Sequence, residues 1–135
     1  MAKSQRRLLL DTHVFIWWLT DNERIGPKAR ALITDPENEI FVSAISGLEI
    51  AIKRSKGQLE ILDGAYELEP LVEICGFEHL PVTFFHGERS GALPPHHRDP
   101  FDRVLIAQAQ AEGMTLLTDD RQIKQYIVRT LPVLA

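Results

Sequence analysis

The sequence is short of cysteine, of long apolar runs and of positive charge. Its single cysteine, Cys75, excludes an internal disulfide and is typical of a reducing compartment, so we expect a cytoplasmic protein. No apolar run reaches the length of a membrane-spanning helix, and Asp11 interrupts the first one too early for a secretory signal peptide. The formal net charge of -4 offers no general basic surface for a nucleic acid. A polyanionic ligand would therefore have to be attracted by something other than net charge.

The composition is that of an ordinary soluble globular protein. The chain has 135 residues, of which 44% are hydrophobic and 25% are charged, and this length can bury a sizeable core. It contains no internal repeat, low-complexity tract or linker. We therefore expect a single domain over residues 1–135.

Short apolar segments alternate with amphipathic ones along the chain. Hydrophobic periodicity and the positions of Ser, Asp, Pro and Gly predict strands at 8–10, 39–42, 80–83, 114–118 and 131–134. They predict helices at 12–19, 27–33, 44–56, 65–75, 84–92, 100–112 and 121–126. This alternation indicates an α/β fold, with a central, mostly parallel sheet flanked by α-helices. In such folds ligands bind beyond the carboxyl ends of the strands.

Several acids fall where that rule places a ligand. Asp11 ends the first predicted strand, and Asp119 and Asp120 follow the strand predicted at 114–118. Asp102 lies at the start of the helix that leads into that strand, so it can reach the same edge of the sheet. Each has a structural explanation as well, because an aspartate stabilises a helix start as a cap or by complementing the helix dipole. Asp99, just before Pro100, fits a helix cap best.

Glu49 lies on a face of its helix where a carboxylate is unexpected. Its three- and four-residue spacing from Ile45 and Ile52, and its place next to Leu48, put it in the apolar stripe. A buried carboxylate without a partner is costly, so Glu49 requires one. The alternative is a common surface pair with Lys53, four residues on, which would contribute roughly 0.2–0.5 kcal/mol.

Several carboxylates gathered at one edge would raise one another's pKa unless a cation neutralised them. Hard divalent cations, Mg²⁺ or Mn²⁺, prefer carboxylate and water oxygens. Such an ion lowers the pKa of a bound water and stabilises charge that builds on a phosphate. Acids, a metal and an accessible edge together suggest hydrolysis of phosphodiester bonds. The net charge does not attract a polyanion. The metal would do so, together with local basic residues such as Lys53, Arg54 and Lys56.

Four segments, in this order and spacing, resemble the PIN-domain ribonuclease toxins of the VapC type. They are LLLDTHVFIWWL, SAISGLEIAIKRSKGQL, HRDPFDRVLIAQAQAEG and LLTDDRQIKQY, and the match runs from about residue 8 to residue 126. The resemblance implies a compact α/β fold around a parallel sheet and an endoribonuclease that depends on Mg²⁺ or Mn²⁺. It also implies a homodimer and a small VapB-type antitoxin, encoded beside the toxin, that neutralises it.

The resemblance also assigns the site residues. Four residues match the family's acids, as catalytic residues and metal ligands: Asp11, Glu49, Asp102 and Asp120. We expect three more residues to contact the metal ligands without binding the metal themselves. They are Thr118, which matches a hydroxyl position of the family, Asp99 and Asp119. The sequence departs from the family at Leu48, where tryptophan is frequent. That position is filled by packing, and because all four acids are present we expect an active enzyme.

The histidines match no zinc-binding pattern. We expect His96 and His97 to lie in a surface loop, and His13 near the site. Two functions of other classes stay open. One is a phosphotransfer domain in which Asp11 accepts a phosphoryl group, although the chain has DTH where aspartyl phosphatases have DxDxT. The other is a non-catalytic module whose acidic pocket receives a basic partner peptide.

Overall fold

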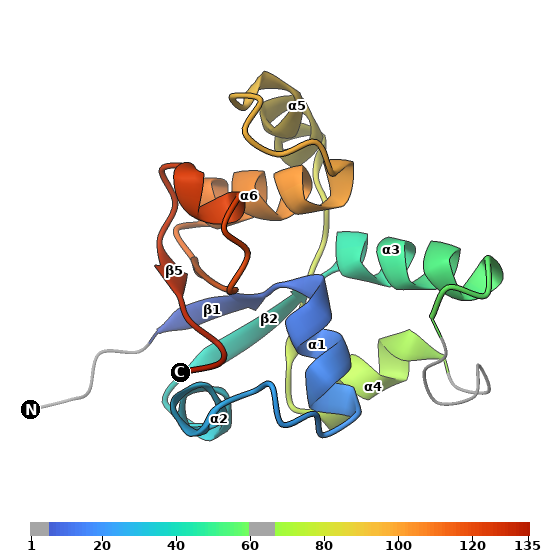
Figure 1. Cartoon of the computed structure of the whole chain (residues 1–135), viewed down its shortest axis with the longest axis vertical. Coiled ribbons are helices and arrows are strands. Elements are labelled where there is room, and N and C mark those ends of the chain that lie inside the picture. Colours follow the sequence, from blue (N-terminus) through green and yellow to red (C-terminus); the bar gives the residue numbers. More distant parts are fainter. Residues whose placement is uncertain (1–5, 60–66) are drawn as a thin grey trace, which may run out of the picture.

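The computed structural model describes residues 6–59 and 67–135, and it contains a five-stranded sheet in the order β3-β2-β1-β4-β5 (Figure 1). Every neighbouring pair of strands is parallel, as the alternation of elements predicts. The strands are β1 Arg7–Leu10, β2 Glu39–Ser43, β3 Glu78–Leu80, β4 Thr115–Leu117 and β5 Thr130–Leu131. The helices are α1 Thr12–Leu19, α2 Pro27–Thr34, α3 Ala44–Ser55, α4 Leu68–Ile74, α5 Phe84–Ala92 and α6 Pro100–Glu112. None of the helices in the described ranges is long and apolar enough to cross a membrane.

The central strand β1 divides the core into two halves. Successive side chains of a strand point to opposite faces of the sheet, so Leu8 and Leu10 pack on one face and Leu9 on the other. All three leucines are fully buried. The first face is covered by α1, α2 and α4, and the second by α6, with α5 packed outside α6 (Figure 1). A strand buried on both faces explains the uninterrupted LLL run.

Local signals fix most helix ends where the sequence predicts them. Ser43 caps α3 by accepting a hydrogen bond from the Ile45 N–H at 3.1 Å. Asp99 caps α6 in the same way, accepting from the Phe101 N–H at 2.9 Å, and Pro100 follows at the first helical position. Gly113 ends α6 with a φ of 66°, a left-handed conformation that favours glycine. These caps confirm the predicted helix starts.

Four predicted elements are wrong in part, and one of them is the strand predicted at 131–134, which lies at Thr130–Leu131. The strand predicted at 80–83 lies at Glu78–Leu80 instead, because Pro81 has no N–H to donate to a sheet and Thr83 caps α5. The helix predicted at 65–75 is found only from Leu68, after its cap Glu67, and residues 65 and 66 lie outside the described part of the chain. The helix predicted at 121–126 is a single 3-10 turn, Ile123–Gln125. It stops there because the backbone at Tyr126 is extended.

Gly26, which precedes α2, allows the C-terminal segment to pack against this helix. Its N–H donates to the Val133 carbonyl at 2.8 Å. A Cβ at this position would overlap the Leu134 carbonyl oxygen and lie 2.7 Å from that of Ala135, and both are backbone atoms that cannot rotate away.

We therefore expect Gly26→Ala to lower the free energy of unfolding by about 1–3 kcal/mol. Gly87→Ala is the matched control, because a Cβ there, inside α5, would meet nothing within 4 Å. That change should instead stabilise the protein by about 0.5–1 kcal/mol, since alanine is the better helix former. Urea unfolding followed by circular dichroism measures both. Equal effects of the two substitutions would contradict the assigned packing of the C-terminal segment.

Candidate functional site

Asp11 lies at the carboxyl end of β1, beside the end of β4. Its backbone N–H donates to the Leu117 carbonyl at 3.2 Å, which extends the pairing of the two strands by one residue. Its side chain caps α1, with Oδ1 accepting from the His13 N–H at 3.3 Å. The capping explanation for Asp11 is therefore correct, and the same residue also faces the other acids of the site. His13 itself is exposed, and its Nδ1 lies 3.9 Å from Asp11 Oδ1.

Thr118 joins Asp11 to Asp120. The Thr118 hydroxyl donates to Asp11 Oδ2 at 2.6 Å and accepts from the Asp120 backbone N–H at 3.1 Å. Thr118 is fully buried, so this bond forms without competition from water. Asp120 Oδ1 in turn accepts from the N–H groups of Gln122 and Ile123, at 2.8 and 3.2 Å. Thr118 thus caps no helix, and it is Asp120 that holds the following turn.

Asp119, the neighbour of Asp120, holds a different part of the chain. Its two carboxylate oxygens accept from the backbone N–H groups of Val133 and Leu134, at 3.0 and 2.9 Å. The structure therefore ties Asp119 to the C-terminal segment, while Asp120 contacts the candidate site. The adjacent acids of the sequence LLTDD have separate partners.

Glu49 is buried in α3 and has one charged partner. Its Oε2 accepts from Lys53 Nζ at 2.7 Å, which is the pair that the surface explanation predicts. This hydrogen bond raises the pKa of Lys53. However, Glu49 is only 1% exposed, and its Oε1 is buried without a hydrogen-bond partner. Leu48, expected in the same stripe, is 50% exposed, so the buried face of α3 runs through Ser46, Glu49 and Ile50 instead.

Asp102 lies in the first turn of α6, where it is buried among other acids. Burial raises its pKa to about 8, and four neighbouring carboxylates add to the rise, those of Asp11, Asp99, Glu49 and Asp120. Burial also raises the pKa of Asp11, although the Thr118 hydroxyl and His13 oppose that shift. The structure thus brings the four predicted acids close enough to act on one another.

His97 lies among these acids, although sequence analysis did not place it there. It does lie in the loop before α6, but it is only 7% exposed, so the prediction of a surface position is wrong. Its Nε2 lies 2.9 Å from Asp102 Oδ2 and 3.2 Å from Asp120 Oδ2. No local pattern indicates this position, because the His97 backbone N–H donates to the hydroxyl of Tyr126, 29 residues further along the chain. His96, by contrast, is exposed and packs its ring edge-on against Tyr126, with 5.1 Å between ring centroids.

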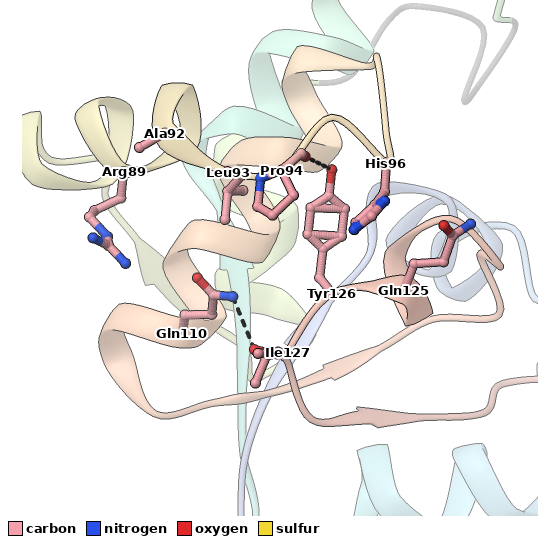
Figure 2. Close-up of a pocket in the computed structure, with 9 residues that line it drawn as sticks. All are labelled: Arg89, Ala92, Leu93, Pro94, His96, Gln110, Gln125, Tyr126 and Ile127. Carbon is pink, nitrogen blue, oxygen red and sulfur yellow. Dashed lines mark hydrogen bonds between the residues drawn. The ribbon is translucent and has the colours of Figure 1, made fainter.

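Arg103 fastens the loop that carries His97. Its guanidinium donates at 2.8–3.3 Å to four backbone carbonyls and one hydroxyl, those of Ser90, Leu93, Pro94, His97 and Tyr126. Figure 2 shows the Tyr126 hydroxyl donating to the Pro94 carbonyl, a bond of 2.6 Å, at the edge of a surface cavity of about 400 Å³. His96 lines this cavity, while the next residue along the chain, His97, faces the acids.

The residues present fit a divalent cation. Glu49 Oε1 is a buried carboxylate oxygen in need of a partner, and Asp102 ionises with difficulty among its neighbours. Ligand-type atoms of His97, Asp102 and Asp120 lie within 4.8 Å of one another. Carboxylate oxygens in this number are the donors that Mg²⁺ and Mn²⁺ prefer.

The raised pKa of Asp102 predicts how stability depends on pH when metal is removed with EDTA. Folded protein keeps the Asp102 proton up to about pH 8, whereas unfolded chain loses it near the ordinary value of 3.8. The folded state therefore binds more protons between these values, and its stability falls as pH rises, by up to about 1.4 kcal/mol per unit from this group. We expect Asp102→Asn to unfold at a higher urea concentration than the wild type at pH 8 and to lose most, but not all, of this advantage at pH 5. An equal difference at both pH values would contradict the assigned shift.

Comparison with known proteins identifies the fold family. Residues 8–128 match the PIN domain. Ribonuclease VapC22 of Mycobacterium tuberculosis is 29% identical over 124 residues, which cover 88% of this chain and 91% of that protein. Among solved structures, the DNA-bound complexes VapBC2 of Rickettsia felis and VapBC of Salmonella typhimurium are similar, with TM-scores of 0.70 and 0.67 and identities of 16% and 17%. In both comparisons the matched region covers 94% of this chain and 98% of the other chain. The resemblance found in the sequence is thereby confirmed, and the chain belongs to the PIN-domain family.

Proposed function

We propose that this protein is a metal-dependent endoribonuclease and the toxin of a type II toxin–antitoxin pair. Membership of the PIN-domain family and the similarity to a ribonuclease named VapC22 support this function. The observation that carries the proposal is the gathering of four carboxylates at one edge of the sheet. One of them, Asp102, has a pKa raised to about 8. Such a cluster is costly as a purely structural feature, and a divalent cation would make it favourable.

We assign four residues to hold one or two Mg²⁺ or Mn²⁺ ions, namely Asp11, Glu49, Asp102 and Asp120. When bound, the cation supplies an activated water and stabilises the charge that develops on an RNA phosphate. Other residues of the chain orient these acids. Thr118 donates to the Asp11 carboxylate and accepts from the Asp120 backbone N–H. Lys53 donates to one oxygen of Glu49, and the other oxygen has no hydrogen-bond partner. Asp99 supports the acids by capping α6, whereas the contacts of Asp119 suit only an indirect role.

The substrate in this proposal is RNA, in spite of the acidic net charge. Lys53 lies close enough to feel the charges of Asp99 and Asp102, so a cation of the protein stands beside the acids. Together with the bound metal it would attract a phosphate to the site. Which RNA is cut depends on the surface around the acids.

The partners in this proposal are a VapB-type antitoxin and a second copy of the chain. The similar solved structures named above are complexes of VapB-type and VapC-type proteins, which supports the first. An arginine of the antitoxin would suit the acidic pocket, because a guanidinium pairs well with carboxylates. We place the pair in the cytoplasm, where a toxin that cuts RNA meets its substrate.

RNA cleavage by purified, partner-free protein tests the proposal. With Mg²⁺ or Mn²⁺ we expect discrete cuts in total RNA, and EDTA should abolish them. Asp102→Asn should slow cleavage by about 100-fold or more, the usual scale for loss of a group that stabilises charge at the reacting centre. Asp21→Asn is the matched control, because Asp21 has an exposed side chain that pairs with Arg30. It should cut like the wild type.

The other outcomes separate the alternatives. Cleavage that survives Asp102→Asn would contradict the assignment of the site. If folded protein cuts no RNA but binds a basic peptide equally well with and without EDTA, the non-catalytic module is correct. Stable phosphorylation of Asp11 would favour the phosphotransfer domain.

A further inference from the structure

We infer that His97 is a positioning residue of this site, which donates its Nε2–H to Asp120, lies directly against Asp102 and does not itself bind the cation. The inference rests on the proposed function, because it concerns the same acids. It assigns a role to a residue outside the acid set.

The hydrogen bonds of the ring fix its tautomer. His97 Nδ1 accepts from the Asp99 backbone N–H at 3.1 Å. A ring nitrogen that accepts a hydrogen bond carries no proton, so the proton of the neutral ring lies on Nε2. That nitrogen faces Asp102 Oδ2 at 2.9 Å and Asp120 Oδ2 at 3.2 Å. His97 is thus a hydrogen-bond donor to Asp120, and the same nitrogen lies in close contact with Asp102.

A metal-binding histidine has the opposite arrangement. It presents a bare nitrogen to the metal and donates its other ring N–H to a carbonyl or carboxylate. In His97 the nitrogen turned away from the acids is the acceptor, and the one turned towards them carries the proton. The closeness of His97, Asp102 and Asp120 therefore reflects the hydrogen bond from His97 to Asp120 and its contact with Asp102, and not a set of three ligands.

The ring is held in place from several sides. The His97 backbone N–H donates to the Tyr126 hydroxyl at 2.9 Å, and its carbonyl accepts from Arg103 at 3.1 Å. These bonds fix the backbone at His97, and the ring of this buried residue is itself held by the bond from the Asp99 N–H to Nδ1. The donor is therefore fixed before any ligand arrives.

A fixed donor between two carboxylates opposes their repulsion. Asp120 Oδ1 already accepts two backbone N–H groups, so the bond from His97 to Oδ2 completes the orientation of that side chain. Asp102 lacks such a turn around it, and His97 is its nearest basic partner among the described residues. Partners of this kind orient metal ligands, and their loss typically reduces metal affinity about 10–100-fold.

Binding of Mn²⁺ to the purified full chain tests the inference without any measurement of activity. The free-Mn²⁺ electron paramagnetic resonance signal gives the Kd. We expect His97→Ala to raise the Kd about 10–100-fold. His97→Gln, whose amide retains an N–H donor, should recover most of the loss. His96→Ala is the matched control, since this exposed neighbour contacts Tyr126 and not the acids, and its Kd should equal that of the wild type.

A second measurement on the wild type separates donor from ligand and needs no variant to fold. Electron spin echo envelope modulation of bound Mn²⁺ should show no coupling to an imidazole nitrogen. Such a coupling would overturn the inference and make His97 a ligand. Unchanged Mn²⁺ affinity in folded His97→Ala would also overturn it, while leaving the proposed nuclease intact. Failure of the wild type to bind Mn²⁺ would overturn both proposals.

Discussion

The repulsion between buried carboxylates is the constraint on which the rest of the site depends. Three donors of the same chain lie against the four acids. Thr118 donates to Asp11, Lys53 donates to Glu49, and His97 donates to Asp120 and contacts Asp102. These donors reduce the repulsion without removing it, since burial and the neighbouring carboxylates keep the pKa of Asp102 at about 8. A site left in this state favours a further positive charge.

The parallel sheet creates this crowding. Because β1 pairs with β4 in register, the residues that follow Leu10 and Leu117 emerge side by side at one edge. The three leucines of β1 are buried on both faces, so the strand cannot slide by one residue without moving an acid into the core. The hydrophobic core therefore fixes the positions of the charged groups.

Sequence reasoning succeeded where the signal was local. The starts of α1, α3, α5 and α6 were predicted correctly because each is marked by a capping side chain within a few residues. It failed at β3 and at the 3-10 turn, where Pro81 and the extended backbone of Tyr126 decide the outcome. The burial of His97 depends on a hydrogen bond to a residue 29 positions away, and no local pattern reveals such a contact. The positions of Asp11 and Asp120 were predictable from the rule for strand ends, whereas Glu49 was singled out by its place in an apolar stripe and by the family resemblance.

The seven residues from His97 to Arg103 have four structural roles. It supplies a donor to the acids, a helix cap, an acid and the guanidinium that fastens the loop. Surface loops usually tolerate insertions and deletions, because little depends on their length. Here one added residue between the donor and the acid would rotate the two apart and break the cap at the same time. This loop is therefore as length-restricted as a buried strand, and variation in the size of the protein has to be accommodated elsewhere.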